Sequence, residues 1–191
     1  MTDLAAALSI LTATLDRLKL PYAIGGSLAS SSRGVWRATN DVDIVAALPE
    51  ALASQVSATL GSDWYADANA MRDAIRAGRA FNVIHIPTSY KFDLFPATNE
   101  FHAIQLQRAS RIAVTLPGGT VDCSVTTAED ILLAKLRWYA DGGEVSERQW
   151  RDIIGILAAN RALDFEYINL WAARLGVSRL LTKALLDRAK E

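Results

Sequence analysis

Ile24-Gly25-Gly26-Ser27 and, thirteen residues later, Asp41-Val42-Asp43-Ile44-Val45 form the stretch that decides how this sequence is interpreted. Side chains alternate faces along a strand, so Asp41 and Asp43 are expected to project from one side of an otherwise buried strand. Two carboxylates that share a small volume repel each other, and a divalent cation with oxygen ligands relieves that repulsion. The glycines precede a small-residue stretch, expected to be helical, where backbone N–H groups can hold a phosphate. The sequence thus predicts a phosphate-binding turn and a metal site on one short segment.

Each half of this pattern has an ordinary explanation when it is taken alone. A Gly-Gly pair is commonly a turn, and an Asp-x-Asp pair is commonly a solvated strand end or loop. Asp-x-Asp also occurs in glycosyltransferases, where the pair holds the metal of a nucleotide-sugar. The combined order and spacing resemble the signature of the nucleotidyltransferase superfamily, which includes the DNA polymerase β palm. The resemblance implies an α+β fold, with a polymerase β palm-like mixed β-sheet flanked by helices and a C-terminal helical segment. It also implies Mg²⁺-dependent or Mn²⁺-dependent transfer of a nucleoside monophosphate from NTP to an acceptor hydroxyl.

A third carboxylate is expected at Asp93, which lies in the apolar run Phe92-Asp93-Leu94. A buried carboxylate without a partner would be costly there, so a shared site with Asp41 and Asp43 is the economical explanation. One alternative is an ion pair between Asp93 and Lys91 or an arginine. Another is Asp122 as the third acid.

The resemblance also implies roles for the individual residues of the site. Asp41, Asp43 and Asp93 would be the catalytic metal ligands, and Asp93 could also take the proton of the attacking hydroxyl. The candidate nucleotide-binding residues near the signature are Gly25, Gly26, Ser27, Arg37 and Thr39.

The chain changes to helix-forming patterns after Val125, so we expect a nucleotidyltransferase core over 1–125 and a C-terminal helical subdomain over 126–191. Thr126-Thr-Ala-Glu129 has the capping-box pattern that begins a helix. The segment from Glu129 to Lys135, followed by Arg148-Gln-Trp-Arg-Asp152, is similar to the helical part of the AbiEii-type branch of the superfamily. That similarity implies Lys135 as a nucleotide-phosphate ligand and Asp152 as a support or a base. Arg148 and Asp152 are also spaced as an ordinary helix-surface pair, worth about 0.2–0.5 kcal/mol.

Hydrophobic periodicity and turn residues predict the remaining elements. The prediction for 98–110 stays open between a short helix and an irregular crossing. The others are helices over 3–18, 27–33, 50–60 and 67–77, strands over 22–24 and 41–48, and hairpins of 81–86 with 90–95 and of 111–116 with 120–125.

Composition narrows the class of protein. Twenty Lys and Arg against twenty-one Asp and Glu give a net charge of −1, so there is no global basic field to attract nucleic acid. The single cysteine, Cys123, excludes an intrachain disulfide and is expected to be a small buried hydrophobe. No apolar run reaches membrane-spanning length and the N-terminus does not resemble a secretion signal, so we expect a cytoplasmic protein.

The acceptor and the biological role stay open at the level of sequence. A tRNA end, a protein side chain or a small molecule could each supply the acceptor hydroxyl. The resemblance allows a component of a bacterial toxin–antitoxin pair, with a partner protein, as the biological setting. A non-catalytic nucleotide-binding member of the fold is the alternative from another class.

Overall fold

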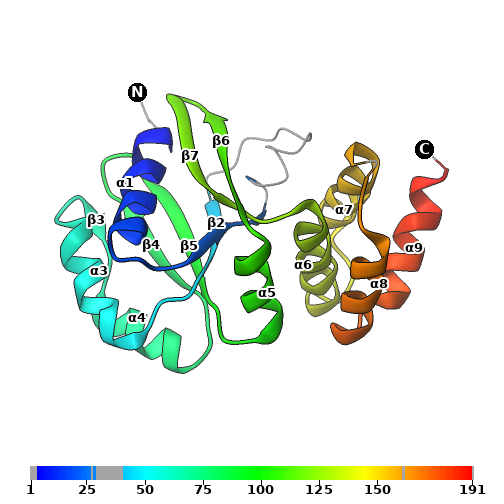
Figure 1. Cartoon of the computed structure of the whole chain (residues 1–191), viewed down its shortest axis with the longest axis horizontal. Coiled ribbons are helices and arrows are strands. Elements are labelled where there is room, and N and C mark those ends of the chain that lie inside the picture. Colours follow the sequence, from blue (N-terminus) through cyan, green and yellow to red (C-terminus); the bar gives the residue numbers. More distant parts are fainter. Residues whose placement is uncertain (1–3, 27, 29–40, 161, 191) are drawn as a thin grey trace. The chain divides into compact units, whose positions relative to one another are not determined.

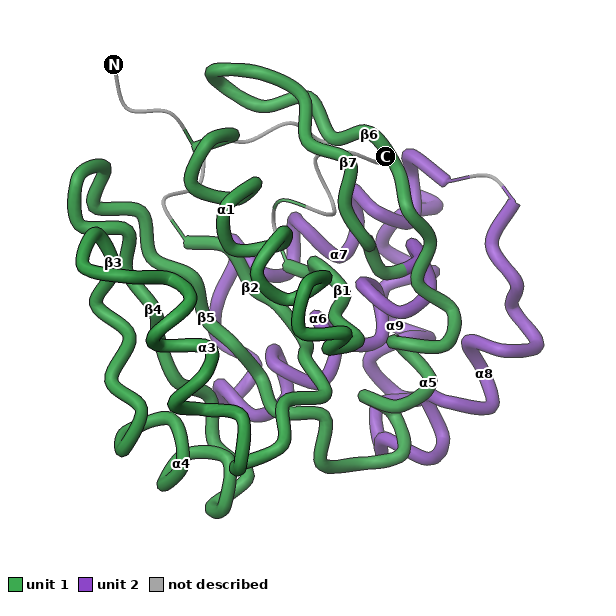
Figure 2. The backbone as a smooth tube through the Cα atoms, turned by 60° about the vertical axis from the view of Figure 1, so that its left-hand side comes forward, with its two compact units in different colours: residues 1–28, 38–126 green, residues 29–37, 127–191 purple. Residues whose placement is uncertain are grey.

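The computed structural model describes residues 4–26, 28, 41–160 and 162–190 (Figure 1). Within these residues the chain divides between Thr126 and Thr127 into two compact units, which Figure 2 distinguishes by colour. No helix among the described residues is long and apolar enough to cross a membrane. The helix predicted over 27–33 and the loop predicted to follow it lie almost entirely outside the described residues.

The first unit is built on a mixed sheet, as predicted. Its described strands follow the spatial order β3-β4-β5-β2-β1-β7-β6. β2 pairs parallel with β5, β1 pairs parallel with β7, and the other pairs are antiparallel. The strands are β1 Tyr22–Ile24, β2 Asp41–Ala46, β3 Trp64–Tyr65, β4 Phe81–His85, β5 Tyr90–Pro96, β6 Ser110–Leu116 and β7 Gly119–Val125.

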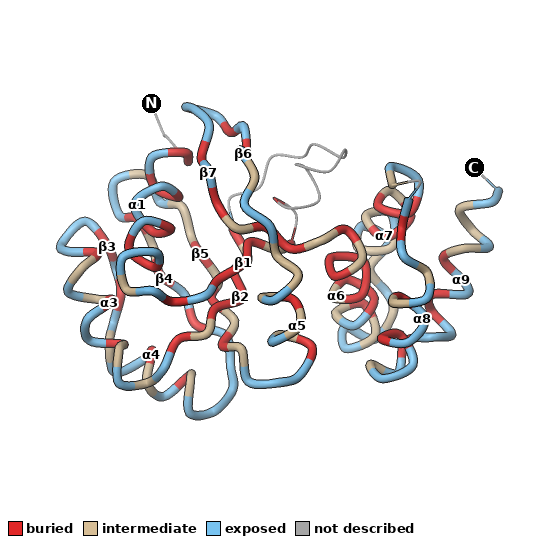
Figure 3. The backbone as a smooth tube through the Cα atoms, viewed as in Figure 1, coloured by how far each residue is buried: buried red, intermediate tan, exposed pale blue. Residues whose placement is uncertain are grey.

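One face of this sheet carries the hydrophobic core. Val42 and Ile44 of β2 are fully buried, and so are Phe92 and Leu94, their partners on β5. The helices α1 (Leu4–Arg17), α3 (Ala53–Leu60) and α4 (Ala68–Arg76) contact one another in series, and α1 and α4 contact the sheet. Figure 3 shows the buried residues of these strands in red. Because side chains alternate along a strand, the residues between the core positions belong to the opposite face.

Most predicted elements of this unit are confirmed, with differences at their ends. The strand predicted to end at Leu48 ends at Ala46, and the helix predicted from residue 50 begins with the 3₁₀ turn η1 (Glu50–Leu52). The segment 98–110, for which the sequence prediction stays open, contains the helix α5 (Glu100–Arg108), which contacts β1 and β2. The two-residue strand β3 was not predicted, because it is too short to show a period.

The second unit consists, in its described part, of the helices α6 (Ala128–Asp141), α7 (Glu147–Ala159), α8 (Phe165–Arg174) and α9 (Ser178–Arg188). Its core includes Leu136, Leu157 and Ile168, all fully buried. The predicted cap of α6 is wrong by one residue. Thr127 accepts the N–H of Asp130 at 3.3 Å, whereas the hydroxyl of Thr126 donates to the carbonyl of Ile24 at 3.1 Å.

Candidate active site

Four charged residues share the face of the sheet opposite the core. In the parallel register of β2 and β5, Asp41 lies opposite Lys91, and Asp43 lies opposite Asp93. These residues alternate with buried Val42 and Phe92, so their side chains leave the sheet on the other side. Neighbouring strands are about 4.8 Å apart, which brings the carboxylates of Asp43 and Asp93 into one small volume.

The glycine turn after β1 is fitted to Asp43. The N–H of Gly25 donates to the carbonyl of Asp43 at 2.8 Å. Gly26 has a φ of +57°, and a Cβ added there would lie 2.7 Å from Cγ and 3.0 Å from Cβ of Asp43. Real Cβ atoms do not approach other heavy atoms so closely, so the Asp43 carboxylate sits where only a glycine leaves room. The Gly-Gly and Asp-x-Asp halves of the signature are therefore in direct contact.

Lys91 is part of this charged cluster, although from the sequence we expected it only as an alternative ion-pair partner of Asp93. Its ammonium lies 3.0 Å from Asp93 Oδ2 and 3.5 Å from Asp41 Oδ1. The hydrogen bond to Asp93 is the main reason why the pKa of Lys91 lies above its ordinary value, with partial burial opposing it. The available signal was the two-residue spacing of Lys91 and Asp93, which puts both on one face of a strand.

The chemistry of these residues fits a divalent cation. Carboxylate oxygens from Asp41, Asp43 and Asp93 are the hard ligands that Mg²⁺ and Mn²⁺ bind, and the bare α-carbon of Gly26 makes room for one of them. In the described parts of the chain, no three His, Cys, Asp or Glu side chains are already gathered as a metal site. A metal would therefore need these side chains to adjust, and the ammonium of Lys91, which contacts Asp41 and Asp93, would have to move.

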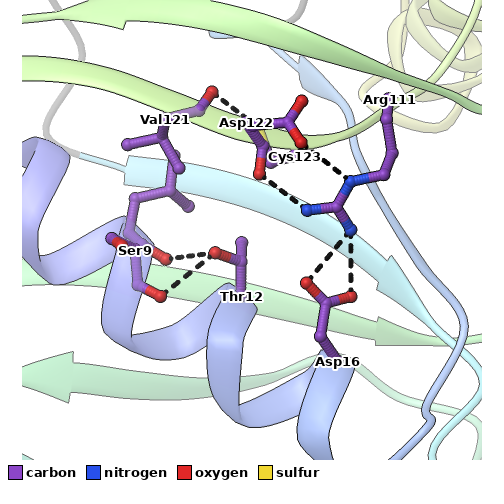
Figure 4. A network of polar contacts seen from close by, with 8 residues as sticks. Ser9, Thr12, Asp16, Arg111, Val121, Asp122 and Cys123 are labelled. Carbon is purple, nitrogen blue, oxygen red and sulfur yellow. Dashed lines mark hydrogen bonds and ion pairs between the residues drawn. The ribbon is translucent and has the colours of Figure 1, made fainter.

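Asp122, the rival third acid, belongs to a different cluster. It lies on β7, and β1 separates β7 from β2 in the sheet. Arg111 donates through Nε to Asp122 at 3.1 Å and through Nη1 to Asp16 at the same distance (Figure 4). The neighbouring Cys123 is fully buried, as predicted, and burial raises the pKa of its thiol to about 11. Between the two rivals, the register therefore favours Asp93 as the third acid.

Lys135 and Asp152, singled out in the C-terminal helices, are partners within the second unit. The ammonium of Lys135 lies 3.0 Å from Asp152 Oδ2, and only 7% of the Lys135 side chain is exposed. Removing one partner of a nearly buried ion pair is destabilising, because the other charge loses that counter-ion in a poorly solvated place. The sequence anticipated neither this pairing nor its burial.

We expect Lys135→Met to lower the free energy of unfolding by about 3 kcal/mol, because Asp152 then keeps its charge without the lysine. Denaturant unfolding measures this loss. Lys190→Met is the matched control, since Lys190 is exposed and also pairs with an aspartate, Asp187. Its expected cost is below about 1 kcal/mol. Equal costs in the two variants would contradict a structural role for the Lys135–Asp152 pair.

Ser27, Arg37 and Thr39, the other candidate nucleotide ligands, lie outside the described residues. Arg148 lies on α7, one helical turn before Asp152.

Comparison with solved structures identifies proteins with a similar fold. No protein-family model matches the chain, and a search of curated proteins finds no relative. Among solved structures, an antigenic nucleotidyltransferase-like protein from Paracoccidioides brasiliensis is 22% identical, with a TM-score of 0.56 over 96% of this chain and 92% of that one. The solution structure of the antibiotic-resistance factor ANT(2'')-Ia is 16% identical, with a TM-score of 0.52 over 97% and 96% of the two chains.

A crystal structure of ANT(2'')-Ia in complex with adenylyl-2''-tobramycin is also similar, at 17% identity and a TM-score of 0.51, over 90% of this chain and 95% of that one. These likenesses establish a nucleotidyltransferase-like fold over almost the whole chain. They confirm the α+β architecture that the glycine and aspartate signature implies. At such identities they establish the fold alone.

Proposed function

We propose that this protein is a metal-dependent nucleotidyltransferase that moves a nucleoside monophosphate from NTP to an acceptor hydroxyl. The observation that carries the proposal is the register that sets Asp43 opposite Asp93, with Gly26 packed against Asp43. The fold supports it, because similar structures include an antibiotic-resistance factor whose complex contains an adenylylated aminoglycoside. We propose the cytoplasm as its site of action, since NTP is available there.

In the proposed reaction Asp41, Asp43 and Asp93 would hold one or two Mg²⁺ or Mn²⁺ ions, which would supply positive charge for the triphosphate and the leaving pyrophosphate. The acceptor oxygen forms a bond to the α-phosphorus as the bond from that phosphorus to pyrophosphate breaks. Asp93 takes the hydroxyl proton; its side chain is 20% exposed, against 57% for that of Asp41.

In this proposal the glycine turn binds phosphate oxygens with the N–H of Gly26 as the donor, while the N–H of Gly25 donates to the carbonyl of Asp43 and so positions the turn. The small-residue stretch that follows Gly25 and Gly26 is expected from the sequence to be helical, and the start of a helix favours anions. Ser27, Arg37, Thr39 and Lys135 are proposed phosphate ligands on the resemblance alone. Arg148 and Asp152 are left without an assigned part in the transfer.

We propose a small hydroxyl-bearing molecule as the acceptor. The support is the likeness to ANT(2'')-Ia over nearly all of both chains, together with a net charge of −1 that disfavours a long nucleic acid. A tRNA end and a protein side chain are the other outcomes that a test must separate. A role in a toxin–antitoxin pair, with a partner protein, would require the protein-side-chain outcome or an RNA outcome.

The test is a transfer assay with the purified protein, Mg²⁺ and each α-labelled NTP in turn, against three separate acceptor pools. The pools are cell RNA, cell protein and a panel of small polyols that includes aminoglycosides. We expect label on a small molecule with the wild type and none with Asp41→Ala. Label on RNA or protein would keep the activity and overturn the acceptor class. No transfer in any pool, despite Mg²⁺–NTP binding, would favour the non-catalytic nucleotide-binding alternative.

A further inference from the structure

Lys91 belongs to the charged cluster of the site, but the proposed reaction assigns it no role. It lies on β5, two residues before Asp93, and faces Asp41 across the parallel register. Its ammonium contacts one carboxylate on its own strand and one on β2, at 3.0 Å and 3.5 Å. Lys91 therefore ties together the two strands that carry the candidate metal ligands.

The surroundings of this contact distinguish it from an ordinary surface ion pair. The Lys91 side chain is 34% exposed and that of Asp93 is 20% exposed, so water screens their attraction only in part. The ammonium also lies between two like charges that would otherwise repel each other. A divalent cation shared by Asp41 and Asp93 would need the same oxygens that Lys91 now contacts.

We propose that Lys91 takes the place of a divalent cation between Asp41 and Asp93, so that lysine and metal compete for the same carboxylate oxygens. The inference rests on the proposed function, because it concerns the same three acids. Without metal, Lys91 neutralises the carboxylates and holds the ligand strands in register. Metal entry displaces the ammonium, which lowers metal affinity and makes Lys91 a positioning residue of the site.

Metal binding without any nucleotide tests the competition directly. Titration with Mn²⁺, followed by the electron paramagnetic resonance signal of the free ion, gives the Kd for each variant. We expect Lys91→Met to bind Mn²⁺ about tenfold more tightly than the wild type, because a partly screened charge next to the ligands is gone. Lys91→Arg keeps the charge and should keep the wild-type affinity. Lys190→Met makes the same substitution at an exposed ion pair and should also change nothing.

A merely structural lysine would not produce tighter binding, since its loss would loosen the ligands. Unchanged or weaker Mn²⁺ binding in Lys91→Met, with binding abolished by Asp43→Asn, would overturn the role of Lys91 and leave the proposed function standing. Absence of Mn²⁺ binding in both wild type and Lys91→Met would overturn both.

A second measurement uses the wild-type chain, so it does not depend on whether Lys91→Met folds. Brief acetylation with an amine-reactive reagent, read by peptide mass spectrometry, reports the accessibility of each lysine. We expect Mn²⁺ to increase the labelling of Lys91 several-fold relative to Lys190, because the displaced ammonium loses its contacts with Asp41 and Asp93. Equal labelling with and without saturating Mn²⁺ would overturn the displacement.

Discussion

Asp43→Asn is expected to lower kcat/KM for nucleotidyl transfer by about a thousandfold or more. The amide has nearly the size of the carboxylate, so it can occupy the space that Gly26 leaves without disturbing the turn. It lacks the negative charge that a divalent cation needs from its ligands. The rate of transfer and the Mn²⁺ affinity should therefore both fall, whereas the thermal unfolding temperature should stay close to that of the wild type.

Asp122→Asn is the matched control for this prediction, because it makes the same chemical change in the same sheet. Asp122 pairs with exposed Arg111 and lies on the far side of β1 from Asp43. We expect this variant to keep the wild-type transfer rate and to lose less than about 1 kcal/mol of stability. Similar activity in Asp43→Asn and the wild type would remove Asp43 from the site, and a large loss in Asp122→Asn would reinstate the rival third acid.

Sequence reasoning reached the fold because its signals were local. Gly25-Gly26 and Asp41-x-Asp43 predicted the two halves of the site. Alternation of apolar and polar residues predicted most strands, and helical periodicity predicted most helices. Weak signals gave less: the two-residue strand β3 was not predicted, and 98–110 stayed open between a helix and an irregular crossing, because α5 buries only Phe101 and Gln105 along its length. The α6 cap was misplaced because Thr126 and Thr127 are identical residues, and only the tertiary bond to Ile24 distinguishes them.

The candidate site was harder to predict wherever it depends on register between strands. Nothing in the sequence states that Asp43 pairs with Asp93, or that Lys91 falls opposite Asp41, because β2 and β5 are separated by two helices and two strands. The contact between Lys135 and Asp152 could not be predicted for the same reason, because it joins two helices and the residues are seventeen positions apart in the sequence. Residue types and spacing indicated which side chains carry charge, whereas the pairing of strands and helices decides which charges meet.

Gly26→Ala is expected to lower transfer activity strongly and to destabilise the first unit by more than the usual cost of an alanine in left-handed conformation. An alanine at positive φ costs about 1–2 kcal/mol. At Gly26 the new Cβ would also lie 2.7 Å from Cγ of Asp43, so the carboxylate must turn away from its present position. We therefore expect a total loss above about 2 kcal/mol, and a transfer rate at least about a hundredfold lower because a misplaced ligand no longer meets its partners.

Gly78→Ala separates the two costs, because Gly78 has a φ of +61° and a Cβ there would meet only Thr98 Oγ1, at an ordinary contact distance of 3.6 Å. It should lose only the conformational cost of about 1–2 kcal/mol and keep full activity. Asp43→Ala completes a double-mutant cycle, since it removes the carboxylate with which the Gly26→Ala methyl clashes. In the Asp43→Ala background, Gly26→Ala should destabilise no more than Gly78→Ala does in the wild type. The contrary result would be that Gly26→Ala lowers the free energy of unfolding equally with and without the Asp43 carboxylate. In that case the close approach of Gly26 to Asp43 is not why glycine is needed here, and the backbone conformation alone accounts for it.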